Sequence, residues 1–422
     1  MHQIPAAGRR PDSSRKCSAG PAGRMPAIIL ALMAVLITAG CATVPKRTPL
    51  AVDQIEEAVI PGIPYARAWG DAPPPNVEIW LTKTPEQLEA EHPALFGKPH
   101  TYLALSGGGP RGAFGAGLMV GWTEAGDRPE FSMVTGVSTG ALMAPFVFLG
   151  PAYDEVLEIL YTRTSTEDIA DMRNKINALT SDAMASSRPL QDLIATYVDE
   201  ALMEALAVEH RRGRRLWIGT TNLDAQRPVI WNLGLIAASG TPGALDLIRK
   251  VLLASASLPG GLPPVLIPVE AGGRTYDELH VDGGAASQVF LYPVGIDWQE
   301  ILRKLEVPGR PGIYLVRNAR LKPEWQAVRN KLTSVMFRSV DSLIRTQGIG
   351  DLYRIYLTAQ RDDMEFNLAR IPDTFQEEET EMFDPVYMGK LFQIGREMAR
   401  NGFPWEKMPP EMVPAAAAEP AP

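Results

Sequence analysis

The stretch from Thr101 to Gly150 constrains the fold of this chain most, because it contains two strand-to-helix turns in succession. The short apolar run Tyr102–Leu105 ends in a glycine-rich turn, and helix-like apolar spacing follows it. A second run, Phe131–Val134, ends in a sharp turn that leads into another apolar segment. Runs of this length are typical of buried strands. Alternating strands and helices indicate an α/β protein.

The first turn reads Gly107-Gly108-Gly109-Pro110-Arg111-Gly112. A strand that turns directly into a helix directs several free backbone N–H groups at one point, which can hold an anion. Glycines there allow positive φ and a close approach of the backbone to a ligand. The turn therefore predicts an anion cradle.

The second turn is a G-x-S-x-G sequence that contains Gly136, Ser138 and Gly140. A serine on such a tight turn, with small neighbours, exposes its hydroxyl. Alone, this pattern is a weak signal. Next to an anion cradle, however, an exposed serine supplies the second part of an acyl-transfer site, a nucleophile beside an oxyanion hole.

The glycines of the first turn also fit another site. Gly107, Gly109 and Gly112 satisfy the G-x-G-x-x-G pattern of dinucleotide-binding proteins. That interpretation requires an acidic residue at the end of the second strand. Asp127 and Glu130 precede the second run instead, so the pattern favours the acyl-transfer site.

A third part lies far downstream, where Tyr276–Asp282 leads into Gly283 and Gly284. In their order, the motifs GGGPRG, GVSTG and VDGG resemble those of the patatin-like phospholipase family. The resemblance extends to the segments 220–224, 254–259 and 263–264, and it covers most of the chain from Thr101 to about Asp373.

The resemblance implies a three-layer α/β/α fold with a mostly parallel central sheet. It implies that Ser138 is the nucleophile and Asp282 its partner in a Ser-Asp dyad, without a cofactor, acting on a lipid or another acyl ester. The resemblance also implies an oxyanion hole at the first turn, formed by Gly107, Gly108, Gly109, Arg111 and Gly112. The turn that carries the serine would be made possible by Gly136 and Gly140, and the glycines of the DGG motif would be Gly283 and Gly284. Ser106 stands where some members have Asp.

Two other interpretations stay open. The order Ser138, Asp224, His280 matches the triad order of α/β-hydrolases, although the spacing fits a dyad better. The second interpretation is a non-catalytic lipid-binding lipoprotein that keeps the fold. The presence of both Ser138 and Asp282 argues against it.

The composition fits a globular protein, with 45% hydrophobic and 21% charged residues among 422. The net charge is −8 and no basic block is present, so we expect no nucleic-acid partner. The five histidines are scattered and neither cysteine has metal-ligand spacing, so we expect no metal site.

The N-terminus predicts a signal peptide over residues 1–40, in which the apolar segment Met25–Gly40 follows basic residues. Its end resembles the lipobox of bacterial lipoproteins, with Cys41 as the lipidated residue and Thr38 as a departure. Because no aspartate follows Cys41, the resemblance favours the outer membrane of a bacterial cell envelope. An ordinary cleaved signal or an uncleaved anchor is the alternative. Beyond residue 40 the chain has 36 basic and 48 acidic residues, so attachment would depend on acyl chains rather than on charge.

We expect a linker and extension over residues 41–100, the hydrolase domain over 101–375, a C-terminal helix packed on the core over 376–408, and a disordered tail over 409–422. Within these, the patterns predict a strand at 77–82, a helix at 84–96 with a Thr84 cap, a long helix from 322 to about 345, an edge strand at 364–371 and a last helix from Asp384 to about Asn401. The segment 162–188 is expected to be a surface loop or a lid.

Overall fold

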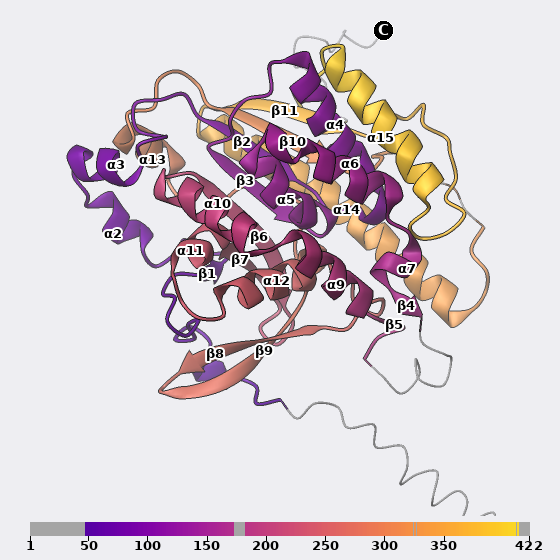
Figure 1. Ribbon diagram of the computed structural model, residues 1–422, viewed down its shortest axis with the longest axis horizontal. Coiled ribbons are helices and arrows are strands. Elements are labelled where there is room, and N and C mark those ends of the chain that lie inside the picture. Colours follow the sequence, from indigo (N-terminus) through magenta and orange to yellow (C-terminus); the bar gives the residue numbers. More distant parts are fainter. Residues whose placement is uncertain (1–46, 173–181, 324, 326, 411, 413–422) are drawn as a thin grey trace, which may run out of the picture. The chain divides into compact units, whose positions relative to one another are not determined.

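The structure is a computed structural model that describes residues 47–172, 182–323, 325, 327–410 and 412, which lie in one unit of the chain. The predicted signal peptide and Cys41 lie outside the described residues. Figure 1 shows helices on both faces of a central sheet. The strands are β1 (Arg67–Trp69), β2 (Thr101–Leu105), β3 (Met133–Val137), β4 (Asp171–Met172), β5 (Ala185–Ser186), β6 (Arg215–Asn222), β7 (Arg227–Asn232), β8 (Val265–Ala271), β9 (Arg274–Asp282), β10 (Gly312–Arg317) and β11 (Glu365–Arg370). The helices of the described part are α2 (Val77–Leu81), α3 (Pro85–Glu91), α4 (Gly112–Ala125), α5 (Thr139–Leu149), α6 (Asp154–Arg163), α7 (Thr166–Ile169), α9 (Arg188–Tyr197), α10 (Glu200–Arg211), α11 (Leu233–Ala238), α12 (Ala244–Ser255), α13 (Trp298–Lys304), α14 (Leu332–Arg361) and α15 (Pro385–Arg400), with short 3₁₀ turns at 52–54, 109–111, 151–153 and 283–285.

The main sheet has the strand order β1-β7-β6-β3-β2-β10-β11. Its five strands β6, β3, β2, β10 and β11 are parallel. β7 returns antiparallel along β6, and β1, from the N-terminal extension, pairs antiparallel with β7. The hairpin of β8 and β9 joins the sheet only through the end of β9. The prediction of an α/β fold with a mostly parallel central sheet is confirmed.

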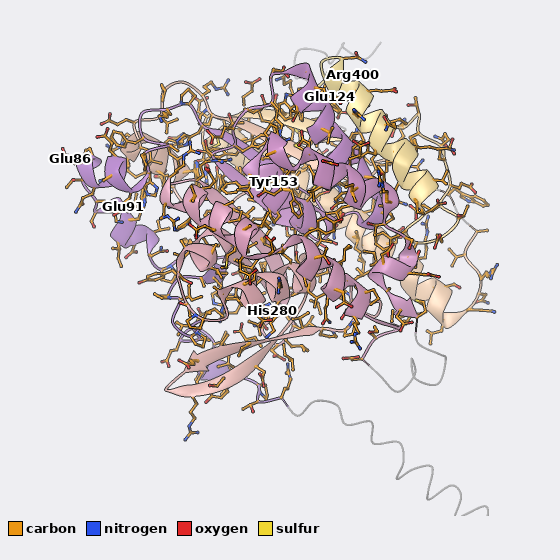
Figure 2. All side chains as sticks on the ribbon, in the orientation of Figure 1. Glu86, Glu91, Glu124, Tyr153, His280 and Arg400 are labelled. Carbon is orange, nitrogen blue, oxygen red and sulfur yellow. The ribbon has the colours of Figure 1, made fainter. Side chains whose placement is uncertain are left out.

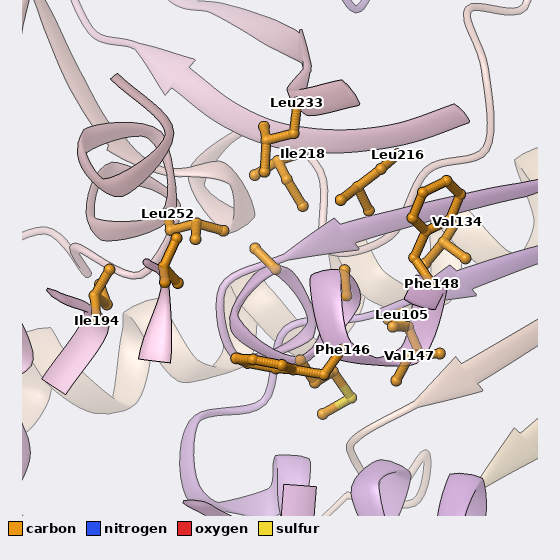
Figure 3. Packing of buried hydrophobic residues seen from close by; sticks show 14 of the residues in the cluster. Leu105, Val134, Phe146, Val147, Phe148, Ile194, Leu216, Ile218, Leu233 and Leu252 are labelled. Carbon is orange, nitrogen blue, oxygen red and sulfur yellow. The ribbon is translucent and has the colours of Figure 1, made fainter. Parts of the chain in front are cut away.

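Alternate residues of β2 show why helices cover both faces. Leu103 and Leu105 belong to a large core cluster that includes side chains of α4, α5, α10, α12 and α15. Tyr102 and Ala104 point to the other face, where they join a smaller cluster with α13 and α14. Because successive strand residues face opposite ways, a strand buried on both faces is apolar throughout. Figure 3 shows part of the large cluster, with Phe146 of α5 below the strands.

The prediction of a strand at residues 77–82 is wrong, because this segment forms helix α2. Val77 and Trp80 are half-buried, whereas Glu78 and Ile79 are exposed, so the apolar side chains follow a helical i, i+3 spacing. The N–H of Val77 also donates to the carbonyl of Pro74, which starts the turn. Five residues are too few for their apolar periodicity to distinguish a helix from a strand.

The remaining element predictions are confirmed with changed bounds. α3 begins after Thr84, whose side chain forms a capping box with Gln87, and it ends five residues before the predicted end. α15 begins after Asp384, whose carboxylate accepts hydrogen bonds from the N–H groups of Val386 and Tyr387. β11 lies at the edge of the sheet as predicted. The long helix begins only at Leu332 and continues unbroken to Arg361.

The segment 162–188 forms the end of α6, α7, the short β4–β5 pair and the start of α9, apart from residues 173–181, which are not described. Within the described residues, none of the helices combines the length and apolar character needed to cross a bilayer.

Candidate active site

Strands β3 and β9 meet end to end along one side of β6. Val137, the last residue of β3, is the partner of Gly219 in a parallel pairing. Asp282, the last residue of β9, is the partner of Thr220 in an antiparallel pairing. Adjacent residues of β6 therefore hold the ends of two strands that run toward each other. This register brings together Ser138, which follows β3, and Asp282.

Ser138 occupies a sharp turn between β3 and α5. Its backbone angles, φ 54° and ψ −125°, define a conformation that residues other than glycine rarely adopt. The flanking glycines make this turn possible. A Cβ on Gly136 would overlap the backbone of Gly140, and a Cβ on Gly140 would overlap the carbonyl of Leu105. Ser138 therefore lies on a tight turn with backbone strain of the kind found at functional turns.

Ser255, the last residue of α12, forms a hydrogen bond with the turn that carries Ser138. The N–H of Ser138 donates to the Ser255 hydroxyl at 3.1 Å, and that hydroxyl donates to the carbonyl of Gly219 at 2.6 Å. Ser255 lies within the sequence motif at 254–259, but the motif alone does not predict this contact. Its hydroxyl links the turn that carries Ser138 to the β6 residue that pairs with Val137.

Asp282 is 3% exposed, and its carboxylate interacts with the Ser138 hydroxyl. It accepts a hydrogen bond from the N–H of Gly284 at 2.7 Å. Burial raises the pKa of Asp282 to about 6, and the interactions with Ser138 and Gly284 oppose that shift. A carboxylate with this pKa is charged at neutral pH and is a stronger base than an exposed aspartate.

The two glycines after Asp282 allow close packing at this point. A Cβ on Gly283 would overlap the carbonyl of Gly219, and a Cβ on Gly284 would press on the amide of Gln288. The Gln288 amide nitrogen donates to the Gly284 carbonyl at 2.8 Å, which fixes the turn behind the carboxylate.

The glycine-rich turn lies on the other side of Ser138. A Cβ on Gly107 would lie 3.2 Å from Cβ of Ser138, so the two turns are in contact. The N–H of Gly107 already donates to the carbonyl of Gln288 at 3.0 Å, and the N–H of Gly112 is bonded within the turn, to the carbonyls of Gly109 and Pro110. Of the glycines predicted for the oxyanion hole, Gly108 and Gly109 are the two whose N–H groups have no hydrogen-bond partner among the described residues.

Asn318, directly after β10, holds this turn in place. Its side chain accepts from the N–H of Gly115 at 3.1 Å and donates to the carbonyl of Ser106 at 2.9 Å. Its own N–H donates to the Ser106 hydroxyl at 2.9 Å, which gives a role to the serine that departs from the family pattern. Sequence reasoning missed Asn318, although a polar residue directly after a buried strand was a usable signal.

Arg111 was predicted to lie near the oxyanion hole. Its guanidinium forms an ion pair with Glu379 at 3.3 Å and a hydrogen bond with Tyr387 of α15. These two contacts join the glycine-rich turn to the C-terminal segment.

The structure does not assemble the alternative triad with His280. The ring of His280 is fully buried, with Nδ1 3.0 Å from the Thr220 hydroxyl and Nε2 3.1 Å from the Glu278 carboxylate. Asp224 is paired with Arg47 instead. Figure 2 shows His280 where the β8–β9 hairpin meets the helices. Burial lowers the pKa of His280, which fits a structural residue.

The dinucleotide interpretation also lacks its acidic residue, because Ser138 and not an acid follows β3. In the described part of the chain, no three His, Cys, Asp or Glu side chains cluster as metal ligands would.

Comparison with known proteins gives one family. The model of the patatin-like phospholipase family matches residues 103–294. Among solved structures, VipD from Legionella pneumophila is similar over 72% of this chain and 67% of that chain, with 12% identity and a TM-score of 0.30. This structural likeness is too weak to support an argument. Comparison with curated proteins gave no match.

Proposed function

Since the domain at residues 103–294 belongs to the patatin-like phospholipase family, we propose that the chain is a serine acyl hydrolase of lipids that uses a Ser138–Asp282 dyad. One observation supports this most: the Ser138 hydroxyl, on a strained turn, interacts with a buried carboxylate whose pKa is about 6. A nucleophile beside a base that can accept its proton is typical of covalent catalysis.

In the acylation step, Asp282 accepts the Ser138 proton as Oγ attacks the ester carbonyl. The N–H groups of Gly108 and Gly109 stabilise the oxyanion, together with the positive end of α4, which begins at Gly112. The protonated Asp282 then donates its proton to the departing alcohol. The products of this half-reaction are a free alcohol, or a lysophospholipid, and an acyl ester on Ser138.

In the second half, water attacks the acyl-enzyme while Asp282 again accepts the proton. The same two N–H groups stabilise the second tetrahedral intermediate. Ser138 leaves with the proton from Asp282, and the fatty acid is released. Each step uses groups of this chain alone.

An apolar cavity beside Thr139 supports an acyl substrate. It has a volume of about 60 Å³ and is lined by side chains of α5, α6, α7, α9 and α15, together with Gly109 of the glycine-rich turn; among them are Leu142, Phe146, Leu160, Ile194 and Met388. An apolar wall next to the nucleophile is suited to a hydrocarbon chain. The small volume favours short acyl chains, and a long chain would have to displace side chains of α7 or α9.

The test compares the protein with its Ser138→Ala variant on a short-chain chromogenic ester and on phospholipid vesicles. We expect both activities to vanish in Ser138→Ala and to persist in the control Ser342→Ala, which changes an exposed serine of α14. The ratio of the two rates distinguishes an esterase from a phospholipase. Equal hydrolysis by Ser138→Ala would exclude Ser138 as the nucleophile.

Lipidation of Cys41 and attachment to the outer membrane of a bacterial cell envelope are part of the same proposal, which rests on the lipobox-like sequence ending at Cys41. Metabolic labelling with a radioactive fatty acid, followed by membrane fractionation, tests it. We expect label in the native chain and none in Cys41→Ala. An unlabelled chain that fractionates with the soluble proteins would contradict it.

A further inference from the structure

A second cavity in the described part is not lined by Ser138 or Asp282. It has a volume of about 460 Å³ and lies where the parallel strands β2, β3 and β6 begin, whereas the candidate active site lies where β3 ends. The N-terminal extension, with α2 and α3, closes it on one side, and α13 lines another. A cavity of this size is in the range of small-molecule sites, and the hydrolase mechanism gives it no role.

Arg215, the first residue of β6, lines this cavity. One nitrogen of its guanidinium donates to the carbonyls of His210, Gly213 and Arg214, at the end of α10. In the described residues no carboxylate forms an ion pair with Arg215. Burial lowers the pKa of Arg215 to about 10, so the guanidinium is still charged at neutral pH. Arg215 is half-buried, and a cation removed from water without an ion-pair partner is costly unless an anion binds there.

The other charged groups of the wall are balanced. Lys83 is paired with Glu91, which Figure 2 labels on α3, and Arg67 is paired with Glu278 at 2.7 Å. The wall also contains three histidines, His92, His100 and His210. Burial lowers the pKa of each, to about 3, 4 and 3 respectively, so all three are neutral at pH 7. The surplus is therefore the single positive charge of Arg215.

Two buried polar atoms of the wall residues lack a partner. Nδ1 of His210 and Nε of Arg67 form no hydrogen bond with the described residues. Buried polar groups are almost always satisfied, and an exception often marks a position where a ligand or water binds. Both atoms belong to residues that line the same cavity as Arg215.

The remaining wall is mainly apolar and aromatic. It includes Trp80, Tyr102, Trp217, Trp298, Ile301 and Leu305. Such a surface binds the hydrophobic body of a ligand, while one guanidinium binds one negative group.

We propose that this cavity is a second ligand site, which binds an amphipathic monocarboxylate such as a fatty acid, with the carboxylate on Arg215 and the hydrocarbon body against the tryptophans. A monoanion matches the single surplus charge. Binding at this site does not require the chemistry of Ser138, so the proposal can be tested independently of the proposed hydrolase activity.

The test is calorimetric titration of the full Ser138→Ala chain at pH 8 with decanoate, and with decanol as the uncharged counterpart. We expect one saturable decanoate site that binds at least about tenfold more tightly than decanol, as a charge-assisted hydrogen bond provides. Arg215→Gln should remove that advantage. Arg211→Gln, an exposed arginine four residues earlier, is the matched control and should change nothing.

Ile301→Trp is the second variant, because it reduces the volume of the cavity and leaves the Arg215 guanidinium in place. It keeps the proposal testable if Arg215→Gln does not fold. It should abolish binding of both decanoate and decanol. Equal affinity for decanoate and decanol would overturn the proposal, and so would an unchanged decanoate affinity in Arg215→Gln. Unchanged binding in Ile301→Trp would also overturn it, because the ligand would then bind elsewhere, such as beside Thr139. Tighter binding of decyl phosphate than of decanoate would overturn the assignment to a carboxylate.

Discussion

Burial of the Asp282 carboxylate determines how the proposed reaction responds to pH. Asp282 accepts a proton only when it is charged, and its pKa is about 6. We therefore expect kcat/KM to rise with pH, to reach half its plateau near pH 6 and to be flat above pH 7, since this quantity reports the base in the free enzyme. A profile measured with a soluble ester checks this. A plateau that already extends below pH 5 would mean that an unperturbed carboxylate, or another group, is the base.

The same burial predicts opposite effects of Asp282→Asn on activity and stability. Loss of the base should reduce turnover about 10²- to 10⁴-fold. The pKa of Asp282 is higher in the folded chain than the usual 3.8, so its contribution to stability is fully present below pH 3.8 and is lost as pH rises through about 6. At pH 8 the uncharged asparagine should therefore raise the free energy of unfolding by about 1–3 kcal/mol, and the gain should disappear below pH 4.

Chemical unfolding at pH 8 and at pH 4 measures that difference. Asp277→Asn is the matched control, because Asp277 lies in the same strand and accepts a hydrogen bond from the N–H of Thr48, away from Ser138. The control should keep its activity. If Asp282→Asn folds and retains near-native turnover, the dyad is incorrect.

At the scale of elements, helices α4 and α15 approach each other through glycines. A Cβ on Gly117 would overlap the carbonyl of Phe392, and a Cβ on Gly121 would overlap that of Arg396. From the other side, Gly395 lies against the carbonyl of Phe114. Figure 2 labels Glu124 and Arg400 where the two helices end near each other. α4 carries the glycine-rich turn at its start, so its packing also positions the proposed oxyanion hole.

We expect Gly121→Ala to destabilise the chain by about 1–3 kcal/mol, because the added methyl group forces the two backbones apart. Gly389→Ala is the matched control in α15, where an added Cβ meets no atom within 4 Å, and it should stabilise by about 0.5–1 kcal/mol through helix propensity. Thermal unfolding of both variants tests the pair. Equal and small shifts in Tm would show that the helices can separate at no cost.

The elements that the sequence predicted best are those with a local signal. Thr84 and Asp384 are side-chain caps, and helices begin directly after both. The strand prediction at 77–82 was wrong, because a segment of only six residues contains too little periodicity to distinguish a strand from a helix. The start of α14 was placed ten residues too early, at a Lys-Pro-Glu sequence that has the features of a helix start but is followed by residues outside that helix.

For the whole molecule, the fold class followed from the order of strands and turns and from the resemblance of three motifs. Ser138 was predicted because it directly follows an apolar strand within a G-x-S-x-G turn, and Asp282 because it ends a strand just before two glycines. Ser255, Gln288 and Asn318 were not found, because their roles arise from hydrogen bonds between distant segments. The cavity at Arg215 was missed for the same reason, since its wall combines the N-terminal extension with residues of four strands and three helices.

The end-to-end meeting of β3 and β9 on β6 also determines when activity returns during refolding. The unit from β2 to α5 closes through contacts near in sequence, whereas Asp282 is separated from Ser138 by 144 positions in the sequence. Contacts between distant segments close later than local ones, because a longer loop loses more entropy. We therefore expect circular dichroism to recover before hydrolysis in a stopped-flow experiment. Simultaneous recovery would mean that the β8–β9 hairpin docks as early as the first strand-helix unit forms.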